Sequence, residues 1–490
     1  MHSRVDQFME TAREEMKNER SQMFLKLFCS GFSRMRQFAL SSFPDPEAAE
    51  SYSRSIRAEV LERMPELLEE FEKKAISRGV KVIWARDAAE ANKIILDIAR
   101  QKGVQYVTKG KSMITEEIGL NEHLIKNGVN VYETDLGEVI TQQLCLPPFH
   151  LVGPAINVPP EKISDIFLKN GILKQSTTDP VTLGKAARMF LREKFRTQEM
   201  GIVGVNMAVA ETGSFINVEN EGNIRMNKSS PKTLVAIMSL EKVVPTLADA
   251  IHMTRMLIRN CTGQKMASYV SFDTGPRKAD ELDGPEDIYM VILDNGRSEI
   301  YKDFKVRDIL KCIRCGACMN TCPVYAKIGG YPYGFTYAGP MGQAINPLLL
   351  GIENTTDLYR ACTLCGSCKE TCPAGVDHPF LFLEYRSREI RKKNAKGNRT
   401  PLSRLENTMA KISSFGMRHG WAWILGARCV RPVLNFLSRD GYIRDIPFGV
   451  KGWFSCRDLM AMPDKTFHDR WKDLQNEPVP LADIGEKEVV

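Results

Sequence analysis

Two cysteine runs with the same spacing constrain this chain more than any other feature of its sequence. The first, CIRCGACMNTCPVY, begins at Cys312, and the second, CTLCGSCKETCPAG, begins at Cys362. Both have the pattern C-x2-C-x2-C-x3-C-P, and together they hold eight of the thirteen cysteines. Cysteines clustered in this way in a long chain indicate a metal site before a disulfide.

The spacing within each run favours a 4Fe–4S cluster over structural zinc. C-x2-C-x2-C-x3-C-P is the bacterial ferredoxin run, whose thiolates ligate iron–sulfur cubanes. Zinc sites usually take two cysteines from each of two C-x2-C knuckles, so a third cysteine and a fourth before proline are surplus to that design. Gly316 and Gly366 occupy matching places and allow a tight bend around a cluster. We predict two 4Fe–4S clusters, with the ligands Cys312, Cys315, Cys318, Cys322, Cys362, Cys365, Cys368 and Cys372.

The sequence also predicts how the two runs share their cysteines. The three closely spaced cysteines can wrap one cubane, and the proline after the fourth fixes φ, lacks an N–H and ends the wrapping turn. In two-cluster ferredoxins the fourth cysteine of each run ligates the other run's cluster. We therefore expect an electron relay of two crossed clusters. One should lie on Cys312, Cys315, Cys318 and Cys372, and the second on Cys362, Cys365, Cys368 and Cys322.

The composition is that of an ordinary globular protein with more than one domain. Its 490 residues exceed the size at which a single core stops growing, and its hydrophobic (43%) and charged (26%) fractions are ordinary. The formal charge of +7 gives little support to an acidic partner, and no nucleic acid is expected. Residues 1–24 contain no apolar signal-like stretch, and the uncharged run at 328–352 is interrupted by Gly and Pro. We expect a cytoplasmic protein.

Residues 78–302 alternate apolar, β-rich segments with helical ones, which predicts an α/β domain with a mainly parallel sheet. The expected strands include VKVIWA from Val80, VQYVTKG from Val104, VNVYETDLG from Val129 and HLVGPAIN from His150. Later strands are IVGVNMAVA, GSFINVEN, TLVAIMSL and IYMVILDNG. The preceding residues 1–77 have the pattern of amphipathic helices.

Polar residues gather at the ends of these strands, where parallel sheets commonly bind ligands. No G-x-G-x-x-G fingerprint and no P-loop is present, so dinucleotide or ATP binding has no direct support. Turns and helix caps are the alternative explanation for each of these residues. We expect Lys111, Glu211 and Ser214 to line one pocket. The full set of candidate cofactor-binding residues is Lys111, Ser112, Asp135, Glu211, Thr212, Ser214 and Arg225.

Several segments together resemble the lactate utilization protein B family. They are KGKSMITEEIGLNEHLIKNGVNVYETDLGEVI, AVAETGSFINVENEGNIRM, PKTLVAIMSLEKVVPTL and DGPEDIYMVILDNGRSE, followed by the first cysteine run in the same order. The resemblance runs from about residue 50 to the C-terminus, and one departure is Gly110, where the family usually carries Ser. It implies a LUD domain, related to the ribose-5-phosphate isomerase and CoA-transferase type of α/β fold. An α-helical dicluster ferredoxin domain and a short C-terminal region follow.

The resemblance also implies a function. The family's context is a three-subunit system that oxidises L-lactate to pyruvate, in which this subunit carries electrons through its iron–sulfur clusters. Other subunits of that system and an unidentified electron acceptor are the implied partners, and the catalytic residues stay unknown. Two alternatives remain open: the iron–sulfur subunit of another 2-hydroxyacid or quinone-linked oxidoreductase, and a LUD-domain sensor of a metabolite or of redox state without turnover.

The C-terminal region holds two features that suggest a partner surface. Residues 386–404 contain eight Lys or Arg and one acid, and GWAWILGARCVRPVLNFL, from Gly420, is apolar but too short and interrupted to span a bilayer. We favour contact with another subunit over a peripheral membrane contact. The predicted parts of the chain are N-terminal helices (1–77), the LUD domain (78–302), the dicluster domain (303–382) and a C-terminal region (383–490).

Overall fold

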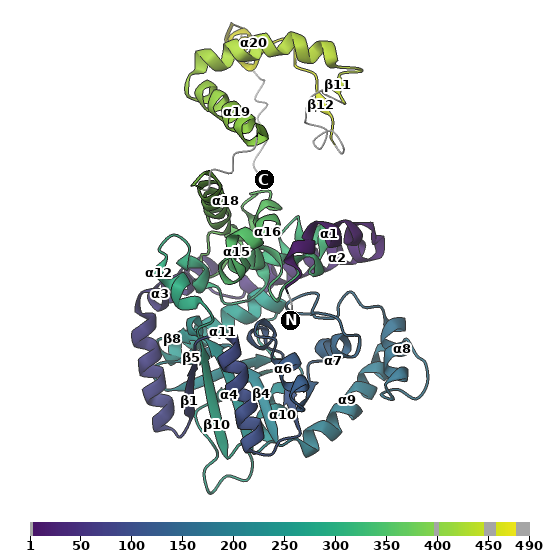
Figure 1. Cartoon of the computed structure of the whole chain (residues 1–490), viewed down its shortest axis with the longest axis vertical. Coiled ribbons are helices and arrows are strands. Elements are labelled where there is room, and N and C mark those ends of the chain that lie inside the picture. Colours follow the sequence, from purple (N-terminus) through teal and green to yellow (C-terminus); the bar gives the residue numbers. More distant parts are fainter. Residues whose placement is uncertain (1–2, 396–400, 445–456, 477–490) are drawn as a thin grey trace, which may run out of the picture. The chain divides into compact units, whose positions relative to one another are not determined.

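A parallel sheet of six strands organises the α/β part of the chain (Figure 1). The structure is a computed structural model that describes residues 3–395, 401–444 and 457–476. The strand order is β1-β10-β7-β4-β2-β3, and every neighbouring pair is parallel. The strands are β1 (Lys81–Ala85), β2 (Tyr106–Lys109), β3 (Asn130–Glu133), β4 (Met200–Gly204), β7 (Thr233–Ser239) and β10 (Asp287–Leu293). The predicted α/β fold is confirmed.

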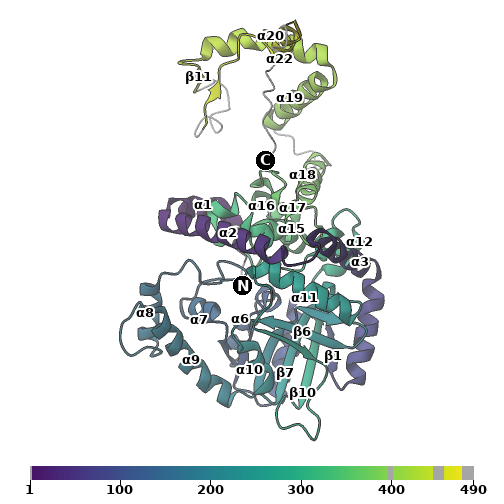
Figure 2. The same ribbon diagram turned by 180° about the vertical axis from the view of Figure 1, so that it is seen from behind.

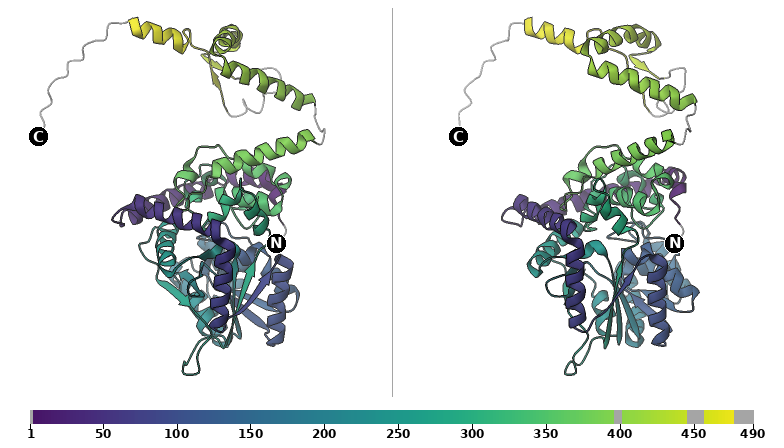
Figure 3. Two further views of the ribbon diagram at one scale, coloured as in Figure 1. Left: turned by 90° about the vertical axis from the view of Figure 1, so that its left-hand side faces the viewer. Right: turned by 60° about the vertical axis from the view of Figure 1, so that its left-hand side comes forward.

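Helices cover both faces of this sheet, which explains why its central strands are continuous apolar runs. Every residue of β7 is buried. Leu234 and Ala236 pack into the core that contains α3 (Pro46–Ser77), whereas Val235 and Ile237 pack into the core that contains α4 (Ala88–Gln101), because successive side chains of a strand point to opposite faces. The side views show α3 and α4 on opposite sides of the strands (Figure 3).

Further helices surround the parallel sheet. α5 (Met113–Glu117) and α6 (Leu120–Lys126) follow β2, α10 (Asn223–Ser229) precedes β7, and α12 (Arg297–Lys302) follows β10. A small helical cluster with its own apolar core lies beyond β3 and consists of α7 (Leu136–Gln143), α8 (Pro160–Lys169) and α9 (Pro180–Thr197) (Figure 1).

A second sheet has the strand order β8-β5-β6-β9. Its strands are β5 (Met207–Val209), β6 (Ser214–Glu219), β8 (Val243–Val244) and β9 (Tyr269–Asp273). β5 and β6 form an antiparallel hairpin, and α11 (Leu247–Thr262) packs on one face of the sheet.

Two features of the strand prediction are corrected by this arrangement. HLVGPAIN forms turns instead of a strand, because Gly153 and Pro154 interrupt its apolar residues. β9 lacks the apolar run by which the other strands were identified, because it lies at the edge of its sheet with no fully buried residue.

The helices predicted before residue 78 are α1 (Phe8–Lys17), α2 (Glu19–Leu40) and α3. Asn18 caps α2 and Asp45 caps α3, each accepting a hydrogen bond from the backbone N–H three residues on. α1 and α2 contact α14 (Tyr325–Ile328) of the cysteine segment, and α2 also contacts α13 (Ala317–Asn320). Figure 2 shows α1 and α2 beside the green helices of the cysteine segment. The N-terminal helices and the cysteine segment therefore share one core.

The cysteine segment itself is helical, as predicted. Turns connect its short helices, which are α13, α14, α15 (Gly339–Leu350), α16 (Thr356–Arg360), α17 (Ser367–Glu370) and α18 (His378–Ala395). α13 and α17 each begin inside a cysteine run and contact each other, which brings the two runs side by side.

The chain divides into two compact units, Met1–Lys392 and Lys393–Val490. The second unit contains α19 (Pro401–Arg418), α20 (Gly420–Leu437), β11 (Tyr442–Ile443), β12 (Leu459–Met460) and α22 (Phe467–Asn476). Across the stretches of chain that the structure describes, no helix combines the length and the apolar character needed to cross a membrane.

The basic segment 386–404 is paired where its side chains are described. Arg386 donates hydrogen bonds to backbone carbonyls, including that of Cys362, and Arg388 pairs with Asp303. Lys392 pairs with an acid of the cysteine segment. These cations hold α18 in place and are not a free patch. Residues 396–400, and the side chains from 393 to 404, lie outside the described residues.

Candidate functional site

The two cysteine runs repeat the same backbone conformation. Gly316 and Gly366 have φ angles of 76° and 86°, which glycine adopts without penalty. Arg314 and Leu364 also match, with φ angles of 60° and 57° in a region that other residues seldom occupy. The N–H of each donates to the sulfur of the first cysteine in its run, at 3.4 and 3.3 Å. The sequence repeat is therefore a structural repeat whose tight turns aim N–H groups at sulfur.

One cavity is lined by cysteines from both runs. Cys312, Cys315 and Cys318 of the first run line it together with Cys372, the fourth cysteine of the second run. Burial, with a further contribution from Cys312, raises the pKa of Cys372 to about 11. Buried thiols gathered in this way become thiolates only when a bound cation stabilises them.

The remaining four cysteines form a second set. Burial, followed by repulsion from Cys362 and Cys322, raises the pKa of Cys368 to about 12. Burial likewise raises the pKa of Cys322 to about 11, with contributions from Cys362 and Cys365. Cys322, from the first run, therefore lies among the cysteines of the second run.

The spacing of these side chains is not that of a mononuclear site. Among residues 3–395, 401–444 and 457–476, no three His, Cys, Asp or Glu side chains are arranged to hold a single metal ion. A cubane contains several irons and its own sulfides, so its four thiolates lie farther apart than the ligands of one zinc ion. The described residues therefore offer no site for a single metal ion, and this result does not exclude a 4Fe–4S cluster.

A buried charge network joins the first cysteine run to the ends of the sheet strands. Arg297, at the start of α12, donates to both carboxylate oxygens of Glu117, at 2.8 and 2.7 Å, and to Glu241 at 3.1 Å. Arg314 donates to the other oxygen of Glu241 at 3.0 Å. Burial alone would raise the pKa of Glu241, but Arg297 and Arg314 outweigh it and hold that pKa at about 2. The network fixes the loop between the first two cysteines against the α/β domain.

A pocket of about 290 Å³, which we call the strand-end pocket, lies where β2, β3, β4 and β7 end. The carboxyl ends of parallel strands commonly form such crevices. Its other walls come from the end of β6, the second half of α11 and the first cysteine run. Three of the predicted ligand-binding residues line it, namely Lys111, Ser112 and Asp135. Ser112 and Asp135 also cap α5 and α7.

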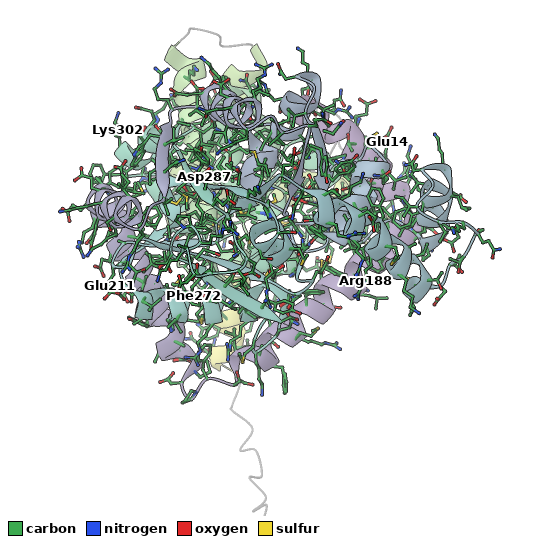
Figure 4. All side chains as sticks on the ribbon, turned by 90° about the horizontal axis from the view of Figure 1, so that it is seen from below. Glu14, Arg188, Glu211, Phe272, Asp287 and Lys302 are labelled. Atoms are coloured by element: carbon green, nitrogen blue, oxygen red, sulfur yellow. The ribbon has the colours of Figure 1, made fainter. Side chains whose placement is uncertain are left out.

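The structure does not bring Lys111 together with Glu211 and Ser214. The strand-end pocket meets one end of the β5–β6 hairpin, whereas Glu211, Thr212 and Ser214 lie at the turn on the other end. Glu211 is exposed at the edge of the molecule (Figure 4), where its carboxylate accepts from the N–H of Leu247. Thr212 accepts from the N–H of Ser214. These contacts are turn and cap chemistry.

Arg225 also lies outside the lining of the strand-end pocket. It is exposed on α10, and its guanidinium stacks over the ring of Tyr269, at 5.1 Å from the centroid. Gly110, where the family pattern has Ser, is likewise outside the lining. A Cβ there would lie 3.1 Å from a side-chain carbon of Ile224 and 3.2 Å from the amide nitrogen of Asn227, which leaves little room for a larger residue.

Sequence reasoning missed functional residues that follow β7 and β10. Lys242 lines the strand-end pocket, and Glu241 and Arg297 form the buried network. The available signal was charged residues placed shortly after a long apolar strand, in TLVAIMSLEKVV and in IYMVILDNGRSE. Charged residues at such positions are buried only when they are paired.

Two protein families match this chain. The LUD domain matches residues 68–293, and the 4Fe-4S dicluster domain matches residues 308–376. The first match covers the parallel sheet and the strand-end pocket, and the second covers both cysteine runs.

Relatives match over most of the chain. Lactate utilization protein B of Bacillus velezensis is 37% identical over 87% of this chain and 88% of its own length. Lactate utilization protein B of Macrococcus caseolyticus is 37% identical over 94% and 96%. The uncharacterized electron transport protein YkgF of Escherichia coli (strain K12) is 38% identical over 86% of both chains. A crystal structure of a DUF162 family protein from Deinococcus radiodurans is 12% identical, covers 47% of this chain and 98% of its own, and has a TM-score of 0.28, too low to support a structural argument.

Proposed function

Because the chain belongs to the lactate utilization protein B family, we propose that it is the iron–sulfur electron-transfer subunit of a multi-subunit system that oxidises L-lactate to pyruvate. The names of its relatives link it to lactate utilization and to electron transport. One observation carries the proposal: the fourth cysteine of the second run, Cys372, faces the same cavity as the first three cysteines of the first run.

The cysteines fit two 4Fe–4S clusters with crossed ligation. Bound clusters would supply the ability to accept and release single electrons. The chain's own residues would hold the clusters: four of the eight ligand cysteines are buried, Cys365 is exposed, and backbone N–H groups point at sulfurs in both runs. The proposed first set of ligands is Cys312, Cys315, Cys318 and Cys372, and the proposed second set is Cys362, Cys365, Cys368 and Cys322.

We further propose that the second unit contacts other subunits of the system in the cytoplasm. Trp421 and Trp423 of α20 are 64% and 54% exposed, and the helix carries basic residues but no acidic one. Exposed tryptophans are typical anchors of protein interfaces. A peripheral membrane contact is the alternative for this helix.

Metal and sulfide content test the proposal directly. Protein purified without oxygen should contain about eight iron and eight acid-labile sulfide per chain, since each cubane contributes four of each. Stoichiometric zinc without sulfide would contradict the relay.

Co-purification separates this function from its alternatives. An assembly that reduces a dye with L-lactate supports the lactate system. A different 2-hydroxyacid as the preferred donor would assign the chain to another oxidoreductase. A solitary chain that binds a metabolite without turnover would support the sensor.

A further inference from the structure

The acidic and basic side chains of the strand-end pocket differ in the hydrogen-bond partners that the protein gives them. Each of its three carboxylates, on Asp135, Glu219 and Glu221, accepts a hydrogen bond from a backbone N–H group. These acids act as caps and turn acceptors. Burial nevertheless outweighs the hydrogen bonds at two of them. It raises the pKa of Glu219 and, with the charge of Asp135, raises the pKa of Glu221 to about 7, so that Glu221 is only partly charged at neutral pH.

The cations of the same pocket keep donor groups that no protein group uses. The ammonium of Lys111 donates to the carbonyl oxygen of Val152, at 2.9 Å. The ammonium of Lys242 makes no hydrogen bond or ion pair with any side chain that the structure describes, although the nearby charge of Glu241 acts on it. Arg314, 9% exposed, bonds Glu241 through one nitrogen, while its Nη1 is buried without a partner. Burial, followed by the charge of Arg314, lowers the pKa of Lys242 to about 8, which still leaves its ammonium largely protonated at neutral pH. An anion from solution could accept hydrogen bonds from both Lys242 and Arg314.

One residue separates this pocket from the first cysteine cavity. Ile313 lies between Cys312 and Cys315 and lines both the strand-end pocket and the cavity of the four cysteines. A ligand in the pocket is therefore one side chain away from the first proposed cluster.

The shape of the pocket limits the size and nature of its ligand. Its volume of about 290 Å³ lies at the lower end of ligand pockets, which span about 300–1,000 Å³. Met238, Leu257 and Ile313 supply apolar walls beside the cations. A carboxylate on a short carbon chain fits both the charge and the walls.

We propose that the strand-end pocket binds a small carboxylate-bearing organic anion, held by Lys242 and Arg314 on the far side of Ile313 from the first cysteine cavity. The binding site does not depend on the proposed electron relay. The cations, the apolar walls and the pocket are present whatever the cysteines bind.

Calorimetric titration of the purified full chain with pyruvate and with butyrate tests the site. We expect saturable binding of at least one of the two, weakened about tenfold or more in Lys242→Met, because a hydrogen-bonded charge is lost. Lys242→Arg should retain most of the affinity. Lys232→Met is the matched control, because Lys232 is exposed at the opposite end of the same strand and lies outside the pocket. If Lys242→Met fails to fold, Ala267→Trp, which fills the pocket from the loop after α11, should abolish binding instead.

Three results would overturn the proposal. The first is no carboxylate binding by the wild-type chain. The second is equal affinity in wild type, Lys242→Met and Ala267→Trp. The third is tighter binding of inorganic phosphate than of either carboxylate, which would assign the pocket to a different anion class.

A second measurement tests whether the bound carboxylate lies beside Ile313, close to the first cluster. It rests on the proposed clusters. The electron paramagnetic resonance spectrum of the reduced protein should change on saturation with the carboxylate in wild type and not in Lys242→Met. An unchanged spectrum on saturation would contradict a carboxylate bound next to the first cysteine cavity. A protein without any iron–sulfur signal would contradict the electron relay and leave the calorimetric result standing.

Discussion

Replacing Cys312 and Cys372 together with serine should remove one cluster and leave the other intact. In crossed ligation these two cysteines hold the same cluster, which would keep only two thiolates, while the second cluster keeps all four. We expect about four iron and four sulfide per chain. One set of electron paramagnetic resonance signals should be lost and the other unchanged, measured on protein purified and reduced without oxygen.

A matched double variant keeps the serine at Cys372 and replaces Cys362 in place of Cys312. Replacing Cys362 and Cys372 together should perturb both clusters, because each would lose one thiolate. Cys429→Ser, an exposed cysteine on α20, serves as the control and should keep the full iron content. If each run bound its own cluster, the two double variants would exchange their outcomes, and the crossed assignment would be wrong.

The fold and the cysteine site were largely predictable because both are recorded in local spacing. Strands buried on both faces must be apolar throughout, as in TLVAIMS of β7, and such runs stand out between polar helices. The cysteine runs carry a spacing that few other sites use, and their positive-φ glycines follow from the tight turns. β9 gave no such signal, because an edge strand needs no continuous apolar run.

Only part of the strand-end pocket was predictable from the sequence. The walls that come from the second sheet, α11 and the first cysteine run depend on how distant parts of the chain pack together. Lys111 and Asp135 follow strands of the parallel sheet, so the end at which they lie is determined by strand direction. Glu211 follows β5, which belongs to the second sheet, and the direction of that hairpin places Glu211 away from the pocket. The contact of Arg314 in the first cysteine run with Glu241, which follows β7, joins distant parts of the chain and no local pattern records it. Lys242 and Arg314 were therefore not recognised as neighbours in one pocket.

Replacing Arg297 with methionine should destabilise the protein by about 3–5 kcal/mol, because it leaves two buried carboxylates without their main partner. Arg297 and Glu117 are both fully buried, and Glu241 is 1% exposed. Urea unfolding followed by circular dichroism at pH 7 measures the loss. Arg196→Met is the control. Its partner Glu193 and Arg196 itself are both more than 60% exposed, so the loss should be below about 1 kcal/mol.

The pH dependence of this loss distinguishes a charge effect from a packing effect. The folded protein lowers the pKa of Glu241 from 4.5 to about 2, because the two arginines outweigh burial. A carboxyl group with a lowered pKa stabilises the fold above its unfolded pKa, and that contribution disappears as pH falls toward the folded value. Without Arg297 the pKa of Glu241 should rise, so the variant binds a proton on folding that wild type does not bind. The difference in unfolding free energy between Arg297→Met and wild type should therefore narrow as pH is lowered from 7 toward 4. A difference that stays constant over this range would show that Arg297 contributes through packing, and that the buried network does not act through charge.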